Sequence, residues 1–437
     1  MLKTEDNELL TRVGPGTPMG DMLRQYWVPA IRSSALEAGG APVRVRLFAQ
    51  DFVAFRSPGG EVGFTLEACP HRGVSLALAR NESFGLQCIF HGWKLNRNGR
   101  VIDAPNEPAK HRAKFVESLR YAPCHAREAG GVLWVYVGKG DPPPFPDWEF
   151  NNLPPERVLM RRGVVHYNWL QAVEAHLDSS HVAFLHAGPV QSGGPVMPRI
   201  ERAELAKYAP QGVAPTFELE ETEYGLQESA LRAVGDDRIY ARVREIVLPF
   251  YIFIPGVPNA HCDARISVPI DDYTTAEWYI VYDPAKPLDP DAARARFLNT
   301  SDDPDDFAAN LGNRENNWHQ DRAAMKTGYW SGIVRNLSFE DFVVQASMGS
   351  MADRSNEQLG TADMIVVTAR RMLLNAVRNF KERNEVPWNS ARIDYREIRA
   401  QSFVYTQHSD DWRRYLDHVQ DNSQRFGSPS TQPREEV

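Results

Sequence analysis

The chain has 437 residues, of which 42% are apolar and 24% charged, and its formal net charge is −8. This length suggests two domains, and the negative charge argues against a nucleic-acid binder. We find no apolar run of about 18 residues, the length that a membrane span needs. The N-terminal sequence MLKTEDNELL carries charges where a signal peptide needs an apolar core. With only four cysteines, the chain is expected to be cytoplasmic.

Two of the four cysteines stand in matched pairs with histidines, Cys69-x-His71 and Cys88-x-x-His91. By chance, a given cysteine has a histidine at a chosen offset roughly 3% of the time, so two incidental pairs are improbable. Zinc sites of the Cys₂His₂ type usually keep the cysteines together and the histidines together. Here each loop supplies one of each. This favours a two-iron cluster with the cysteines on one iron and the histidines on the other.

The two motifs, CPHRG (69–73) and CIFHGW (88–93), resemble the cluster loops of Rieske proteins. Runs of strand-forming residues, such as GVLWVYVG (131–138), predict that they belong to a small β domain. The proline-rich segment DPPPFPDW (141–148) is a stiff exit from this domain. Together these features predict an N-terminal segment and an all-β Rieske [2Fe-2S] domain over residues 1–145.

A second group of chemically active side chains lies in NWLQAVEAHLDSSHVAFLHAG (168–188), which has the apolar spacing of a helix. Glu174, Asp178 and His181 fall at i, i+4 and i+7, on one helical face. His186 lies about 140° further round an ideal helix than His181. Both imidazoles can therefore reach one metal ion only if the helix ends or bulges between them. The alternative is a solvated polar face with incidental histidines.

This spacing resembles the iron-binding helix of the Rieske non-haem iron ring-hydroxylating oxygenases. In that family two histidines and a downstream carboxylate hold a mononuclear ferrous iron. The resemblance assigns His181 and His186 to that role, with Glu174 supporting them. The segment 339–363 is similar to the family stretch in which an aspartate precedes an apolar helix face and a glutamine, which favours Asp341 as the carboxylate. The candidates for this ligand are Asp321, Asp341, Asp353 and Asp363.

Within that family the chain resembles the phthalate dioxygenase branch, whose oxygenase has a single kind of subunit. The resemblance implies an α+β chain with a helix-grip catalytic domain, a curved antiparallel sheet around a long helix, over residues 146–425. A frayed tail is expected at 426–437. The resemblance also implies a homotrimer or two stacked trimers. There Asp178 of one subunit would reach His71 or His91 of the next, which gives Asp178 a catalytic part in electron transfer.

A phthalate-like substrate would bring a carboxylate into a dry cavity, where an unpaired charge is costly. Arginine suits such a group because it pairs with a carboxylate through two hydrogen bonds. Arg242 and Arg244 share one face of the predicted strand RIYARVREIVLPFYIFIPG (238–256). Arg244 is the first candidate for the substrate clamp and Lys207 a weaker one. The alternative is that both arginines lie on a solvated sheet face.

The resemblance therefore predicts the oxygenase component of an aromatic ring dioxygenase. O₂ would be the co-substrate, and a phthalate- or benzoate-like acid would be converted to a cis-dihydrodiol. A separate NAD(P)H-dependent reductase is expected, because the sequence has no G-x-G-x-x-G fingerprint for a flavin or nicotinamide. Two alternatives stay open. One is an O- or N-demethylating monooxygenase of the same architecture, and the other is a Rieske electron carrier with a degenerate second domain.

Overall fold

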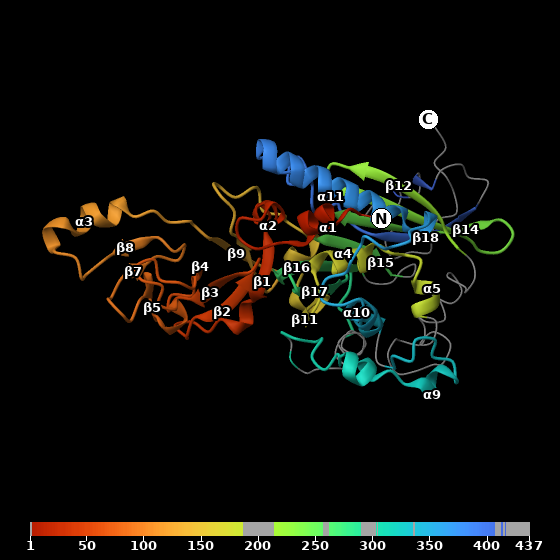
Figure 1. Ribbon diagram of the computed structural model, residues 1–437, viewed down its shortest axis with the longest axis horizontal. Helices are drawn as coiled ribbons and strands as arrows, with labels where there is room; N and C mark the ends of the chain where they lie inside the picture. The colour runs from red at the N-terminus through yellow and green to blue at the C-terminus, as the bar shows by residue number, and fades with distance from the viewer. Residues whose placement is uncertain are drawn as a thin grey trace.

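The computed structural model has two regions that follow one another along the long axis of the molecule (Figure 1). Within the described part of the chain, no helix is both long and apolar enough to cross a membrane. Lys207 and the expected tail at 426–437 lie outside the described residues. The structure describes residues 2–186, 214–256, 262–289, 303, 305–334, 337–406, 412, 413 and 416.

The N-terminal region is built from short strands. These are β1 (Val28–Arg32), β2 (Val43–Leu47), β3 (Gln50–Arg56), β4 (Val62–Leu66), β5 (Arg80–Glu82), β6 (Gly85–Gln87), β7 (Lys94–Leu95), β8 (Val101–Asp103), β9 (His125–Ala129) and β10 (Val132–Tyr136). They form three antiparallel sheets with the orders β1-β10-β9, β2-β3-β4 and β5-β6-β7-β8. All five residues of β10 are buried because it is the central strand of its sheet. Its unbroken apolar run reflects that position.

The C-terminal region is one eight-stranded antiparallel sheet with helices packed on it. Its strands are β11 (Val158–Val165), β12 (Thr216–Thr222), β13 (Gly225–Ala233), β14 (Arg238–Val247), β15 (Tyr251–Pro255), β16 (Cys262–Asp271), β17 (Thr274–Tyr282) and β18 (Gln401–Thr406). The order is β11-β17-β16-β15-β14-β13-β12, and β18 pairs with β14. The structure agrees with the predicted α+β organisation, a small all-β domain followed by an antiparallel sheet packed with helices.

The α-helices are α1 (Thr4–Thr11), α2 (Pro18–Leu23), α3 (Ala109–Ser118), α4 (Trp169–Leu177), α5 (Val182–Leu185), α9 (Arg322–Met325), α10 (Leu337–Ser347) and α11 (Met364–Arg383). The 3₁₀ turns are η1 (Ser33–Ala35), η2 (Leu76–Leu78), η3 (Glu149–Asn152), η4 (Pro155–Arg157), η5 (Arg314–His319) and η6 (Thr361–Asp363). Helix α4 packs on β15, β16 and β17, and α11 packs on α1, α2 and α4. This layering places α4 between the sheet and the long helix α11 (Figure 1).

The first residues of the chain pack on the catalytic region. The Asn7 side chain donates to the carbonyl of Ala352 at 3.1 Å, and the Trp169 indole donates to the carbonyl of Leu10 at 3.2 Å. Helices α1 and α2 both contact α11. The expected unit 1–145 therefore has two parts. One is the β domain, and the other is the segment with α1 and α2, which packs on the C-terminal region.

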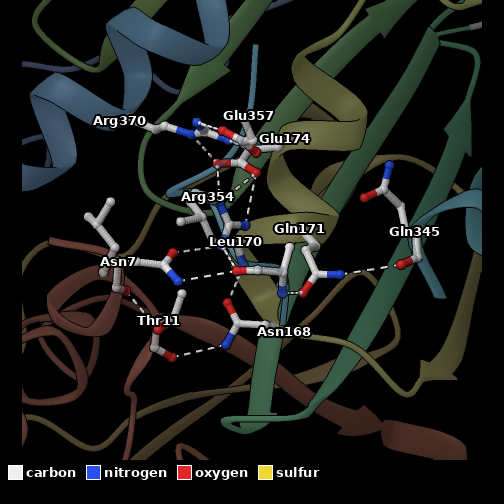
Figure 2. Close-up of polar contacts among 12 residues, drawn as sticks. Asn7, Thr11, Asn168, Leu170, Gln171, Glu174, Gln345, Arg354, Glu357 and Arg370 are labelled. Carbon is white, nitrogen blue, oxygen red and sulfur yellow. Dashed lines mark hydrogen bonds and ion pairs between the residues drawn. The ribbon is translucent and has the colours of Figure 1, made fainter. Parts of the chain in front are cut away.

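Glu174 of α4 is the centre of a buried ionic network (Figure 2). Its carboxylate pairs with Arg354 at 2.9 Å and with Arg370 at 2.6 Å. Arg354 also donates to the Asn7 side chain, and Arg370 pairs with Glu357. Burial opposes the charge, but the two guanidinium groups together lower the pKa of Glu174. The expectation that Glu174 supports the iron ligands directly is corrected, because both carboxylate oxygens are used to fasten α4 to α1 and α11.

Candidate metal centres

The two cysteine–histidine loops are closed by the same turn. The Gly73 N–H donates to the Cys69 carbonyl at 2.8 Å, and the Gly92 N–H donates to the Cys88 carbonyl at 3.0 Å. Both glycines have positive φ, 76° and 73°, a conformation that a β-carbon makes costly. The glycines in the two motifs are therefore required by the backbone, and each closes a turn four residues after its cysteine.

The loops bring like groups together. Cys69 and Cys88 are both buried and near enough to affect each other's ionisation, while the rings of His71 and His91 lie 4.5 Å apart between centroids. The ring of Trp93 stacks on His71 at 4.6 Å. Burial raises the pKa of the Cys69 thiol to about 11. The Nδ1 atom of His91 is buried and has no partner among the described residues. Two neighbouring thiols and two neighbouring imidazoles, one of them with a ring nitrogen that has no hydrogen-bond partner among the described residues, are the ligand set of a Rieske cluster.

Purified protein should be red-brown and should carry about two acid-labile sulfides per chain, as expected for a [2Fe-2S] cluster. Its reduction potential should fall as the pH rises, because imidazole ligands lose protons more readily when the cluster is oxidised. Sulfide analysis and potentiometry between pH 6 and 9, about the range in which ligated imidazoles titrate, measure both properties. Tetrahedral zinc without sulfide would contradict this assignment.

The helix of the second site breaks earlier than its spacing predicts. The Asn168 side chain accepts the Leu170 N–H and starts α4, but α4 ends at Leu177 because Asp178 has extended backbone angles (φ −74°, ψ 127°). Asp178 accepts hydrogen bonds from both the N–H and the hydroxyl of Ser180, at 2.6 and 2.7 Å. This turn is a local alternative to continued helix. The chain restarts as the single turn α5.

The break brings three possible metal ligands together. His181 and His186 flank α5, and the first turns of α10 carry Asp341. One ligand atom from each of the three lies within 4.8 Å of the other two. The Asp341 carboxylate is 3.4 Å from Nε2 of His181 and 3.2 Å from Nε2 of His186. Of the other predicted candidates for the carboxylate, Asp321 caps α9 and Asp353 is an exposed turn residue.

A further carboxylate stands behind each imidazole. Asp178 lies 3.4 Å from Nδ1 of His181, and Glu340 lies 2.8 Å from Nδ1 of His186. These contacts fix both rings so that Nε2 faces Asp341, an arrangement common behind metal-bound histidines. Glu340 is fully buried, and the Ser331 hydroxyl donates to its second oxygen. Glu340 was not predicted from the sequence. The available signal was an acid directly before Asp341 in the apolar run FEDFVV.

The three carboxylates make this site attractive to a cation. Burial lowers the pKa of both histidines, but the carboxylates outweigh it, so the pKa of His181 is raised and that of His186 rises to about 10. Burial likewise opposes the charge of Asp341, and the two imidazoles nevertheless hold its pKa well below the ordinary range. Two histidines and one carboxylate in this arrangement suit a ferrous ion with open positions.

The affinity of metal-free protein for Fe(II), or for Co(II) as a spectroscopic probe, should rise with pH. A histidine must lose its proton before Nε2 can bind a metal, and below its raised pKa of about 10 the His186 imidazole holds that proton. Each proton displaced makes the apparent affinity increase about tenfold per pH unit. Metal titrations at several pH values below that pKa measure the slope. An affinity that did not change with pH would contradict protonated imidazoles in the metal-free site.

Arg244 is not available as a substrate clamp. It is 1% exposed, its Nε donates to the Glu228 carboxylate at 2.7 Å, and its Nη1 donates to the His176 carbonyl at 2.7 Å. Its remaining nitrogen bonds Glu228 and the carbonyl of Leu177. Arg244 therefore ties the end of α4 to the sheet, which corrects its predicted role. Removing it would leave the buried Glu228 carboxylate with the Ser179 hydroxyl but without its charged partner, at a cost of about 3–5 kcal/mol.

Arg242 is the better placed cation. A cavity of about 130 Å³ lies beside the three possible metal ligands, and Arg242, Arg244, Arg265 and Tyr279 are among the residues that line it. Of the two predicted arginines, Arg244 has all its nitrogens bonded within the protein. Among the described residues Arg242 makes one hydrogen bond, to the carbonyl of Pro255 at 3.4 Å. Burial lowers the pKa of its guanidinium to about 10. A carboxylate entering the cavity would relieve that unfavourable burial.

The fold and the two centres define a class of protein, a two-centre iron oxygenase with a Rieske domain and a mononuclear iron domain. Residues 26–120 match the family model "Rieske [2Fe-2S] domain" and residues 135–432 match "LigXa C-terminal domain like". The matched regions cover most of the chain. This chain belongs to the Rieske non-haem iron oxygenases, as an oxygenase subunit whose cofactors are the Rieske cluster and a mononuclear iron.

Similar proteins extend the comparison. The chain is 35% identical to the 3-chlorobenzoate-3,4-dioxygenase oxygenase subunit of Comamonas testosteroni, over 94% of this chain and 97% of that protein. It is 36% identical to the phthalate 4,5-dioxygenase oxygenase subunit of Pseudomonas putida, over 87% of each. A 5,5'-dehydrodivanillate O-demethylase oxygenase subunit from Sphingobium is 29% identical, over 86% and 80%. The oxygenase in a solved oxygenase–ferredoxin complex of carbazole 1,9a-dioxygenase has the same fold, with a TM-score of 0.56 at 18% identity, over 89% and 96%.

Proposed function

We propose that this oxygenase subunit dihydroxylates an aromatic carboxylic acid to a cis-dihydrodiol. The observation that carries the proposal is the guanidinium of Arg242, which lines the cavity beside the three metal ligands and has no carboxylate partner among the described residues. A guanidinium in a small, partly apolar cavity suits a ring that bears a carboxylate. Two similar proteins, named for 3-chlorobenzoate and phthalate, support the same substrate class.

In this proposal His181, His186 and Asp341 hold the mononuclear iron, and Cys69, His71, Cys88 and His91 hold the cluster. The iron supplies the activation of O₂ when it is bound. The surrounding side chains orient the metal ligands and bind the substrate. Asp178 and Glu340 orient the two imidazoles, and Arg242 fixes the substrate carboxylate.

We further propose that electrons come from a separate reductase or ferredoxin and cross a subunit boundary. Figure 1 shows β7, next to the cluster loops, and α5, between the two histidines, at opposite ends of one chain. A ring of three subunits would bring the cluster of one beside α5 of the next, a closed head-to-tail arrangement. Asp178, 3.4 Å from His181 and partly exposed, is then the residue that would meet His71 or His91 of that neighbour.

Arg242→Gln should weaken the binding of an anionic aromatic substrate by about 2–5 kcal/mol, because it removes one member of a desolvated charge pair. Both metal centres should remain filled. Arg238→Gln is the matched control, since Arg238 lies on the same strand but is exposed. Calorimetric titration of the iron-loaded proteins with benzoate and phthalate measures the effect. Equal affinities in the two variants would remove Arg242 from substrate binding.

The reaction itself is tested by a screen of benzoates and phthalates for substrate-dependent O₂ uptake, with product analysis. A cis-dihydrodiol supports the proposal. Release of formaldehyde from a methoxylated ring would instead support the demethylase alternative, which the similarity to a demethylase subunit keeps as a second candidate. The electron-carrier alternative is disfavoured, because all three possible metal ligands are in place. Absence of O₂ uptake with every acid would contradict the proposed substrate class.

A further inference from the structure

On strands β13 and β14, the face of the sheet that carries Arg242 has more buried positive than negative charge. Arg242 and Arg244 alternate along β14, and opposite them on β13 stand Ala230 and Glu228. Arg232, on the same face of β13, is opposite Tyr240. Glu228 is paired with Arg244, so it neutralises one of the three guanidinium groups. The other two have no carboxylate partner among the described residues.

Arg232 is the more deeply buried of these two. It is 2% exposed, and its Nε is buried without a hydrogen-bond partner in the part of the chain that the structure describes. Burial lowers the pKa of its guanidinium. An arginine in this state is unfavourable unless an anion reaches it. Arg232 does not line the iron-side cavity described above. A substrate carboxylate bound by Arg242 would therefore not pair with Arg232.

Arg232 lines a second cavity, of about 790 Å³, on the other side of His181. His181 lines both the iron-side cavity and this one, and Ser180, Thr216 and Thr361 are further polar residues in the lining of the second. The size lies in the range of small-molecule sites, and a few polar groups in an apolar lining are typical of them. The apolar lining includes Phe184, Phe217, Leu219 and Met364.

We propose that this second cavity binds a molecule with an apolar ring and one carboxylate, whose carboxylate pairs with Arg232. The guanidinium supplies a planar pair of donors that match a carboxylate, and the phenylalanine, leucine and methionine side chains cover the ring. The site is distinct from the iron-side cavity and goes beyond the proposed function. An acid bound in the second cavity would lie next to His181 but outside the iron-side cavity that Arg242 lines.

The experiment is calorimetric titration of the iron-loaded protein with benzoate. Wild-type protein should bind a second equivalent that Arg232→Gln loses, with affinity at that site falling at least about 30-fold. Arg242→Gln should show the reverse, losing the equivalent at the iron side and keeping the one at Arg232. Arg238→Gln, an exposed arginine of the neighbouring strand, is the control and should keep both. If the iron-side cavity binds no benzoate, the proposed function fails on its own. The one benzoate molecule bound at Arg232 would then still be lost in Arg232→Gln, and this loss tests the second site.

Two measurements keep the proposal testable if Arg232→Gln folds poorly. Benzamide, a neutral analogue of benzoate, should leave the second site of the wild-type protein empty, because it has no charge for the guanidinium. Arg232→Met should melt at a higher temperature than wild type in the absence of acid, since it removes an unpaired buried charge, and benzoate should stabilise it less. The proposal would be overturned if wild-type protein bound only one benzoate molecule and Arg232→Gln bound it with the same affinity. It would also be overturned if the second site of wild-type protein bound benzamide as tightly as benzoate.

Discussion

Asp341→Ala should reduce the iron content from about three atoms per chain to about two, the number in a Rieske cluster. Asp341 supplies the carboxylate that faces both imidazoles, and without it the two histidines form an incomplete set for a ferrous ion. The red-brown colour and the acid-labile sulfide should be retained, because the cluster lies in the other domain. Metal analysis after gel filtration, with sulfide determination, measures both centres on one sample.

The matched control for this experiment is Asp353→Ala. Asp353 lies in the same segment of the chain, is exposed, and accepts hydrogen bonds from Ser355 in a surface turn. It should keep all the iron. If Asp341→Ala also kept its full iron content, Asp341 would not be a ligand. A loss of iron in the Asp353 variant alone would move the assignment to that residue.

Asp178→Asn should slow electron transfer from the reduced cluster to the mononuclear iron by roughly 10- to 100-fold, the usual effect of altering the partner of a metal-bound histidine. Asparagine keeps an oxygen that can accept from Ser180, so the turn after α4 should survive. What is lost is the charge. Burial opposes that charge, but hydrogen bonds from His181 and Ser180 lower the pKa of Asp178 to about 2. Asp178 is therefore ionised throughout the neutral range.

The measurement is single-turnover stopped flow on pre-reduced protein with substrate and O₂, following reoxidation of the cluster. Iron content and oligomeric state, determined on the same preparation, should match wild type. Asp147→Asn serves as the control, because Asp147 is an ionised surface residue paired with Arg396. Reoxidation at the wild-type rate in Asp178→Asn would leave Asp178 a structural residue of the helix end.

The sequence was most informative where chemistry is local. The cluster loops are short segments in which cysteine, histidine and glycine stand within five positions of one another, and the turns in the structure need those residues in that order. The spacing of His181 and His186 likewise required a break in the helix. The position of the break was not predictable, because it depends on the hydrogen bonds between Asp178 and Ser180 rather than on apolar periodicity.

Pairings between distant segments could not be predicted. Alternation placed Arg242 and Arg244 on one face correctly, but their different surroundings follow from the register that sets Glu228 opposite Arg244. Glu174 has the spacing of a metal-site residue, and two arginines about 180 and 196 positions later take its carboxylate. Glu340 supports His186 only because α10 packs beside α4. In each case a partner far along the chain decides what a carboxylate or guanidinium does.

The attachment of the N-terminal helix to the catalytic region has a consequence for the order of events during synthesis. The side chain of Asn7 bonds to Ala352, 345 positions later. At about 5–20 residues per second, a ribosome needs roughly 17–70 s to supply that partner. The β domain has all its strands long before then and can close around its cysteines first. Helix α1 is therefore made before the β domain but reaches its final contacts after it, and α4 is fastened only when Arg354 and Arg370 are available.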